Sequence, residues 1–398
     1  MKIELLAPAG NLEKLKIAIR YGADAVYIAG QQFGLRSAAD NFSRYEVEQA
    51  ISFAHHRKKK VYITLNAYLH NHELEELPEF LGFLNEVHPD GVICSDLGVV
   101  SCVGQHTNIP IHISTQASVL NQYHAEVWKQ HGAHRIVTGR EISIQEAADI
   151  KKNTGLEVEM FIHGAMCMSY SGQCTISNYT AGRDSNRGGC IQSCRFKYKL
   201  YPEDQKPVDT FFMSSKDLQG IRLLDQFKHY GIDSLKIEGR MKSNLYIAST
   251  VRAYSQALNR LQNHQDVNYD YFENELKKIP NREYTTGSLS SPADETSVYD
   301  KQDELCTDYE MAGNILEIDR SQKRCAFQAK NKIQIGEELE ILTFSDSVKT
   351  IKIDHLLNMS NVVLTVAQPN NIFWLPWQEG MEVQNVARMK KTNDNRIR

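Results

Sequence analysis

The chain has 398 residues, of which 41% are hydrophobic and 24% charged, so it can bury a sizeable core and form two or three domains, although one α/β barrel alone can take about 250 residues. Its net charge of −4 excludes a global field that would attract nucleic acid or a membrane, so a polyanion would have to meet a local basic patch. No signal-peptide run and no stretch approaching about 18 apolar residues is present, which predicts a cytoplasmic protein without a membrane span.

Short apolar runs alternate with longer amphipathic runs through the first two-thirds of the chain. The first unit is a strand over 3–8 followed by a helix with Asn11 as its N-cap and Gly22 just past its end. Further strands are predicted at 24–30, 60–66, 90–96, 109–115, 134–140, 157–164 and 233–239, and helices at 44–57, 73–86, 121–131, 143–153, 216–230 and 242–263. Eight strand–helix units favour a (β/α)8 TIM-like barrel, with an open doubly wound sheet as the alternative.

One connection in this series is far longer than the others. About fifty residues, over roughly 164–213, separate the seventh strand from the next predicted helix, whereas βα loops usually have about 2–6. This insertion leaves from the carboxyl end of a strand, and in an α/β barrel that face carries the active site. A loop of this length there predicts a functional role.

The pattern changes after about residue 265. One more helix is predicted within a segment, 266–308, that continues as a polar linker rich in Pro, Gly and Ser. From 309 to 398, short alternating runs separated by polar turns predict a small antiparallel β-barrel. Its strands are predicted at 313–319, 324–330, 337–344, 348–357 and 362–368. The barrel with its insertion is therefore expected to occupy 1–265.

The insertion holds half of the eight cysteines of the chain, in the spacing C-x6-C-x15-C-x3-C. They are Cys167, Cys174, Cys190 and Cys194. Clustered thiols in a reducing compartment are more typical of metal or redox sites than of disulfides. The wide, uneven spacing favours an iron–sulfur cluster over a tetrahedral zinc ion, which usually has closer cysteine pairs; free thiols are a third alternative. Arg183, Arg187 and Arg195 in the same loop could offset the negative charge of the thiolates.

Polar side chains at the carboxyl ends of the predicted strands form a second group of candidates. The candidate catalytic residues are Asp96, Glu141, His163 and Glu238. The candidate substrate-binding residues are Arg36, Asn66, Gln116, Arg140, Arg240 and Lys242. Arginines in a pocket suit the capture of a carboxylate or phosphate. Each residue could equally belong to a structural ion pair, as Glu141 could with Arg140. The hydrolase motifs HExxH and GxSxG are absent.

Six segments together resemble peptidase family U32, long labelled collagenase-like. They are "ELLAPAG", "YGADAVYIAG", "EMFIHGAMCMSYSGQC", "NRGGCIQSCR", "SSKDL" and "SLKIEGRMKS". The resemblance covers the barrel from end to end and extends into the C-terminal barrel. Within the family the chain is similar to the prephenate-dependent tRNA uridine hydroxylases, which make 5-hydroxyuridine at the wobble position of tRNA.

This resemblance implies a 4Fe-4S cluster on the four cysteines and prephenate as the oxygen source in place of molecular oxygen. The two carboxylates of prephenate would be received by cations among Arg36, Arg140, Arg240 and Lys242. The RNA partner would be the anticodon loop, with the wobble base splayed out to enter the pocket. Three alternatives remain: a collagenase-like peptidase, a hydroxylase of ribosomal RNA, and a zinc-stabilised RNA-binding module.

Overall fold

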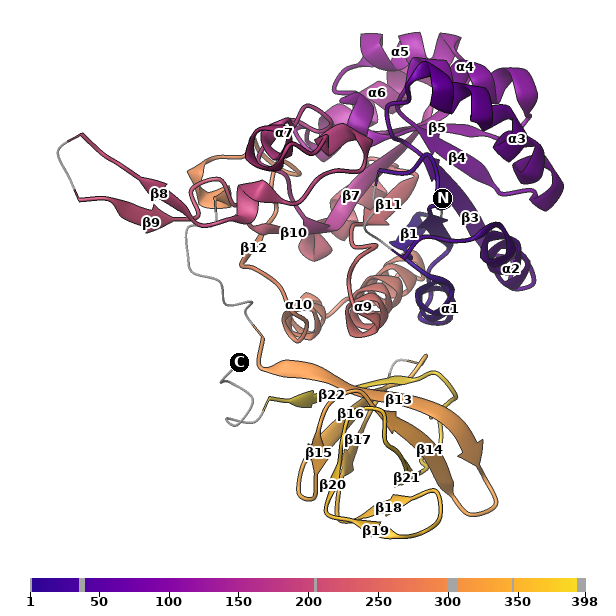
Figure 1. Ribbon diagram of the computed structural model, residues 1–398, viewed down its shortest axis with the longest axis vertical. Helices are drawn as coiled ribbons and strands as arrows, with labels where there is room; N and C mark the ends of the chain where they lie inside the picture. Colours follow the sequence, from indigo (N-terminus) through magenta and orange to yellow (C-terminus); the bar gives the residue numbers. More distant parts are fainter. Residues whose placement is uncertain (1, 36–39, 204–205, 299–306, 346, 392–398) are drawn as a thin grey trace.

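A closed barrel of eight parallel strands forms the larger part of the computed structural model (Figure 1). The structure describes residues 2–35, 40–203, 206–298, 307–345 and 347–391. The strands are β1 (Glu4–Pro8), β2 (Ala25–Ile28), β3 (Lys60–Leu65), β4 (Gly91–Cys94), β5 (Ile111–Ile113), β6 (Ala133–Val137), β7 (Glu157–Ala165) and β11 (Ser234–Ile237). They pair in this order, and β11 closes the barrel by pairing with both β7 and β1. The predicted TIM-like fold is confirmed.

Helices cover the outside of the barrel between successive strands. They are α1 (Leu12–Arg20), α2 (Arg44–His55), α3 (Asn71–Val87), α4 (Leu97–His106), α5 (Gln122–Gln130), α6 (Ile144–Thr154), α8 (Leu224–His229) and α9 (Asn244–Gln262). Polar caps fix where several of them begin, because a side-chain oxygen satisfies a free amide of the first turn. Asn11 accepts from the amide of Lys14 as predicted, and Ser43 forms a capping box with Glu46. The sequence thus encodes these helix starts locally.

The insertion after β7 returns to the barrel as a strand instead of a helix. Residues 217–219, predicted as helical, form β10 (Asp217–Gln219), which pairs antiparallel with the end of β7. That part of the prediction was wrong, because pairing with β7 outweighs local helix preference. Between these strands lie the short helix α7 (Ile176–Ala181) and the hairpin of β8 (Tyr198–Leu200) and β9 (Val208–Thr210), which projects from the barrel (Figure 1).

The segment predicted as a helix and polar linker also packs on the barrel. The helix is α10 (Tyr269–Lys277), which lies beside α9. Beyond it, β12 (Tyr284–Thr285) pairs parallel with β10 and so extends the barrel sheet. The linker prediction missed this contact because a two-residue strand leaves no hydrophobic period in the sequence.

The C-terminal part is a curled antiparallel sheet (Figure 1). Its strands, in spatial order, are β17 (Val348–Lys352), β16 (Glu338–Leu342), β22 (Val386–Lys390), β13 (Tyr309–Asp319), β14 (Arg324–Ala329), β21 (Ile372–Pro376), β18 (Leu356–Asn358) and β19 (Val363–Leu364). A separate pair joins β15 (Ile333–Gln334) to β20 (Val366–Ala367). The strands predicted at 313–319, 324–330 and 337–344 are confirmed, whereas those predicted at 348–357 and 362–368 each divide into two short strands, and β15, β21 and β22 were not predicted.

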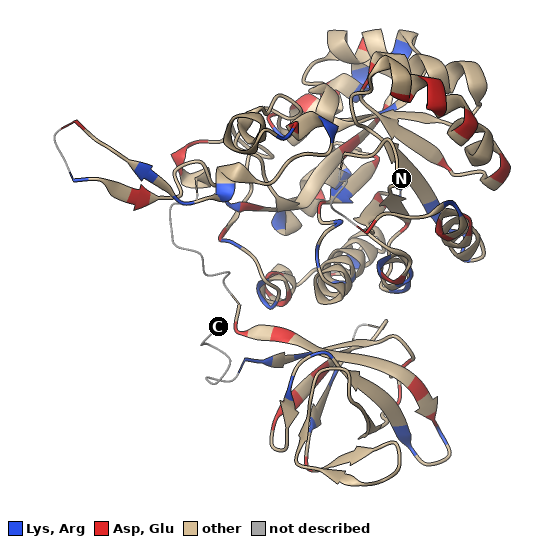
Figure 2. Ribbon diagram, in the orientation of Figure 1, with Lys and Arg blue, Asp and Glu red and all other residues tan. Residues whose placement is uncertain are grey.

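Buried polar contacts join this sheet to the barrel. Arg388 of β22 is fully buried and lies 2.7 Å from both Glu275 of α10 and Glu340 of β16. The hydroxyl of Tyr21, at the end of α1, donates to the carbonyl of Leu342 at 2.6 Å. Acidic and basic residues are interspersed along the elements of both parts (Figure 2). Among the described residues, no helix is both long and apolar enough to cross a bilayer.

An ionic network occupies the interior of the barrel. The Arg135 guanidinium contacts Glu4 at 2.7 Å and Glu159 at 3.1 Å, and Lys236 contacts Glu159 at 2.8 Å. Glu159 is inaccessible to solvent, and although burial opposes its ionisation, Lys236 and Arg135 lower its pKa to about 2. The network links β1, β6, β7 and β11, which are the strands around the closure of the barrel.

Replacing Glu159 by Gln should destabilise the protein strongly, because Lys236 and Arg135 would lose their shared carboxylate. Removing one partner of a buried ion pair costs about 3–5 kcal/mol of unfolding free energy. Urea denaturation followed by circular dichroism measures it. The matched control is Glu79→Gln, which breaks an exposed pair with Arg44 and should cost less than about 1 kcal/mol. Equal effects of the two substitutions would contradict a structural role for the network.

Candidate functional site

The cysteine loop, residues 166–216, crosses the carboxyl ends of several barrel strands. After β3, Arg187 forms a bidentate pair with Glu73, with nitrogen–oxygen distances of 2.9 and 3.0 Å. After β6, the carboxylate of Glu141 accepts from the amide of Ser171 at 2.8 Å. These contacts hold the loop over the face of the barrel on which active sites are found.

A tight backbone contact fixes the loop at the end of β5. Gly172 has φ +77°, and a Cβ placed on it would lie 1.9 Å from the carbonyl oxygen of Gln116. Only glycine can adopt this conformation and approach so closely without strain. The loop therefore depends on Gly172 to lie flat on the barrel.

The structure brings the four predicted cysteines together. Cys167, Cys190 and Cys194 line one cavity of about 280 Å³, which we call the sulfur cavity. Burial raises the pKa of the Cys194 thiol, and the nearby thiols of Cys167, Cys190 and Cys174 raise it further, whereas Arg195 lowers it. Within the described ranges, no three His, Cys, Asp or Glu side chains gather closely enough to hold a single metal ion. Three of the four thiols thus border one cavity, and Cys174 lies near enough to affect the pKa of Cys194 without lining that cavity.

Three cationic side chains share that cavity. Arg140, Arg195 and Lys242 line it together with the cysteines. A nitrogen of Arg140 donates to the sulfur of Cys167 at 3.7 Å, and its guanidinium lies 4.1 Å from the ring centre of Phe161. This places positive charge next to a thiol that would carry negative charge as a thiolate.

The cationic side chains at this cavity are not fully balanced by the neighbouring carboxylates. Burial lowers the pKa of Lys242, and Arg195 and Arg282 lower it further, although Asp217 opposes them. Asp217 is itself committed to Arg282, whose amide and guanidinium both donate to its carboxylate. A bound anion would therefore relieve repulsion between buried cations.

Two of the four candidate catalytic residues line a cavity. Glu238 borders the sulfur cavity, and its carboxylate accepts from the hydroxyl of Tyr27 at 3.4 Å. Glu141 borders the larger pocket described below.

The other two candidate catalytic residues occupy structural positions. Asp96 caps α4 by accepting from the amides of Gly98 and Val99. His163 is 1% exposed, and burial lowers its pKa to about 3. Its ring nitrogen lies 3.3 Å from the Tyr254 hydroxyl, underneath the site and outside both cavities.

The candidate substrate-binding residues divide in the same way. Arg140 and Lys242 line the sulfur cavity, whereas Asn66, Gln116 and Arg240 line neither of the two cavities. Asn66 accepts from the amide of Leu35 at 3.2 Å, and Arg240 is 5% exposed. Arg36 lies outside the described residues.

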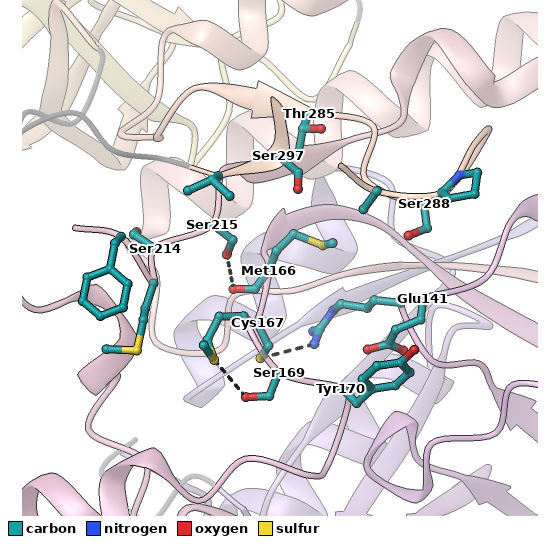
Figure 3. Close-up of a pocket in the computed structure, with 17 residues that line it drawn as sticks. Glu141, Met166, Cys167, Ser169, Tyr170, Ser214, Ser215, Thr285, Ser288 and Ser297 are labelled. Carbon is teal, nitrogen blue, oxygen red and sulfur yellow. Dashed lines mark hydrogen bonds between the residues drawn. The ribbon is translucent and has the colours of Figure 1, made fainter. Parts of the chain in front are cut away.

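A second pocket, of about 500 Å³, adjoins the sulfur cavity (Figure 3). The two share Arg140, Met166 and Cys167 as a common wall. The remaining lining residues are Glu141, Met168, Ser169, Tyr170, Phe212, Met213, Ser214, Ser215, Thr285, Ser288, Pro292, Ala293, Ser297 and Val298. This pocket is not predicted from the sequence, because residues 285–298 have the polar composition of a linker and no hydrophobic pattern that would indicate a contact with the barrel.

Two family models match the chain. The model of peptidase family U32 matches residues 10–298, and the model of the C-terminal domain of that family matches residues 307–388. The boundary between them falls where the barrel ends and the curled sheet begins.

Several bacterial proteins are similar to this chain. The tRNA hydroxylation protein P1 of Bacillus subtilis is 39% identical over 88% of this chain and 87% of its own length. The tRNA hydroxylation protein P of Escherichia coli is 29% identical over 98% of this chain and 97% of its own. The 23S rRNA 5-hydroxycytidine C2501 synthase of E. coli is 36% identical over 65% of this chain and 40% of its own.

Replacing Gly172 by Ala should lift the cysteine loop from the barrel, because the new Cβ would collide with the backbone at Gln116. We expect peptides spanning 166–195 to exchange amide hydrogens much faster. The control is Gly182→Ala, since Gly182 also has positive φ (+60°) but no atom lies within 4 Å of the position that its Cβ would take. That variant should cost only about 1 kcal/mol from backbone strain and leave exchange near 172 unchanged. Identical exchange in the two variants would rule out the contact as an anchor.

Proposed function

The chain belongs to peptidase family U32, and from this premise we propose that it is an RNA hydroxylase that acts on tRNA. The names of the B. subtilis and E. coli relatives support an RNA substrate. The specific reaction that we propose is 5-hydroxylation of the wobble uridine in the anticodon loop, with prephenate as the hydroxyl donor and a 4Fe-4S cluster as cofactor. The observation that carries the proposal is the cavity bordered by cysteines and cations at the carboxyl end of the barrel.

The donor set suits a cluster with several metal atoms. Four cysteine thiolates are the usual ligands of a 4Fe-4S cluster, and Cys167, Cys174, Cys190 and Cys194 would supply them. Three of these residues, Cys167, Cys190 and Cys194, line a cavity of about 280 Å³, which is larger than a single ion requires. When bound, the cluster would supply an iron–sulfur centre for redox or Lewis-acid chemistry. Arg140 would stabilise the adjoining thiolate by its hydrogen bond to Cys167.

The cations of the same cavity suit a dicarboxylate such as prephenate. Lys242 and Arg195 are partly desolvated and repel each other, so a carboxylate beside them would form strong charge-assisted hydrogen bonds. Glu238 on the same wall could hold or move a proton near the bound acid. Lys242 and Arg140 are the members of the predicted carboxylate-binding set that line this cavity.

Protein purified without air should contain about four iron atoms per chain and show the broad visible absorption of an iron–sulfur cluster. Cys194→Ser should lose most of the iron, because it removes the ligand that lies among the other three. Cys102→Ser, a half-buried thiol on α4 outside the loop, should keep the full iron content and the absorption. Stoichiometric zinc in place of iron would contradict the cluster.

Purified protein should form 5-hydroxyuridine in tRNA isolated from cells that lack the gene, and only when prephenate is added. In Lys242→Gln, the prephenate concentration for half-maximal rate should rise about ten- to hundredfold, because a charge-assisted hydrogen bond is lost. Lys330→Gln, a change at an exposed residue just after β14, should behave as wild type. Nucleoside mass spectrometry measures the product.

Two outcomes would contradict this proposal. Unmodified tRNA with iron-loaded wild-type protein and prephenate would exclude the reaction. Proteolysis that persists in Cys194→Ser would favour the peptidase alternative.

A further inference from the structure

The larger pocket has a lining unlike that of the sulfur cavity. Its walls combine apolar side chains, including Met166, Met168, Phe212 and Met213, with the hydroxyls of five serines and one threonine. Figure 3 shows Ser215, Thr285, Ser288 and Ser297 on one side, and Cys167, Ser169 and Tyr170 across from them. Arg140 and Glu141 supply the formal charges of this lining, one of each sign. The pocket therefore suits a largely apolar, uncharged molecule with several hydrogen-bonding groups.

Aromatic rings stand exposed at this pocket. Tyr170 is 59% exposed and Phe212 is 44% exposed. Exposed aromatic rings beside a pocket provide stacking surfaces for the flat face of a nucleobase. Phe212 is held in place by Tyr198, at the base of the projecting hairpin, with ring centres 5.8 Å apart.

The polar edge of the pocket offers both a donor and an acceptor. The side chain of Arg140 lines the pocket, and its guanidinium carries N–H donors. The carboxylate of Glu141 is an acceptor that Ser171 holds in position. A pyrimidine base carries donors and acceptors along one edge and would satisfy both groups, which an aliphatic or purely anionic ligand would not.

Positive charge close to the pocket suits the backbone of the same ligand. Lys197 and Lys199 flank Tyr198 at the base of the hairpin, and both are exposed; Asp209 stands opposite Lys199 in the paired strand, which leaves Lys197 without an acidic residue opposite it in the hairpin register. Exposed lysines beside stacking aromatic rings are typical of binding sites for single-stranded nucleic acid. A pocket of the size of a base thus lies near lysines that could contact the phosphates of the same RNA.

We propose that this pocket receives the flipped-out pyrimidine base of the RNA substrate, stacked on Tyr170 and Phe212. The inference rests on the proposed function and adds the place of the base. Because the pocket and the sulfur cavity share Arg140, Met166 and Cys167, a base in one lies beside a co-substrate in the other. Arg140 would thus contact both reactants across the common wall.

Photocrosslinking tests the position of the base. An anticodon stem-loop RNA carrying 5-iodouridine at the target position is irradiated with iron-loaded, full-length protein, and the crosslinked peptide is identified by mass spectrometry. We expect crosslinks to Tyr170 or to the 212–213 segment. The same RNA with 5-iodouridine in its stem should not give these crosslinks.

Variants in the same assay measure the contribution of stacking. Tyr170→Ala and Phe212→Ala should each weaken stem-loop binding about five- to hundredfold, since stacking on one aromatic ring contributes that much. The control Tyr45→Ala removes a ring that is 68% exposed on α2, away from the pocket, and should bind as wild type. Iron content and circular dichroism confirm that each variant is folded and loaded.

The outcomes separate this inference from the function on which it rests. If wild-type protein hydroxylates tRNA but crosslinks outside the pocket, or if both aromatic variants bind as wild type, the pocket assignment is wrong and the function stands. If wild-type protein neither binds nor modifies RNA, both are wrong. Crosslinks in the pocket together with weakened binding by the aromatic variants support the assignment.

Discussion

The site depends on the antiparallel pairing of β10 with the last residues of β7. Gly164 and Ala165 face Leu218 and Asp217, so the cysteine loop leaves and re-enters the barrel at one place. Gly164 has φ +110°, and a Cβ there would lie 2.6 Å from the Glu238 carbonyl oxygen, so a glycine at this position also lets the end of β7 approach the residue that follows β11. Joining the loop ends by strand pairing lowers the conformational entropy that the loop would otherwise retain. The thiols can then be fixed in space although they are far apart in sequence.

The same pairing assembles the second pocket. Asp217, held in β10, binds the backbone amide and guanidinium of Arg282, and this buried pair draws β12 against β10. Residues after β12 thereby reach the cysteine loop and complete the pocket wall. The short strand β10 thus supports both the sulfur cavity and the larger pocket, and a substitution of Asp217 would disturb both.

Charge is distributed unevenly along the barrel interior. Deep inside, acidic and basic groups are matched, as in the network of Glu159 with Arg135 and Lys236. At the carboxyl end, the pKa values of Lys242 and Arg195 are lowered because burial and neighbouring cations outweigh the available carboxylates. Matched charges stabilise a fold, whereas an excess of one sign marks a place for a ligand of the opposite sign.

Sequence alone determined the barrel, the curled sheet and the oversized loop, because apolar periodicity and cysteine spacing are local properties of the chain. It also indicated residues that line the two cavities, namely Cys167, Cys190, Cys194, Arg140, Glu141, Glu238 and Lys242. Only the tertiary structure decided that His163 is buried beneath the site and that Asp96 caps a helix, because position at a strand end does not fix where a side chain points. Residues 285–298, which form one wall of the larger pocket, could not be assigned to it from the sequence either. They reach the pocket because β12 pairs with β10, about 70 residues earlier in the chain, and the segment has no hydrophobic periodicity that would predict this pairing.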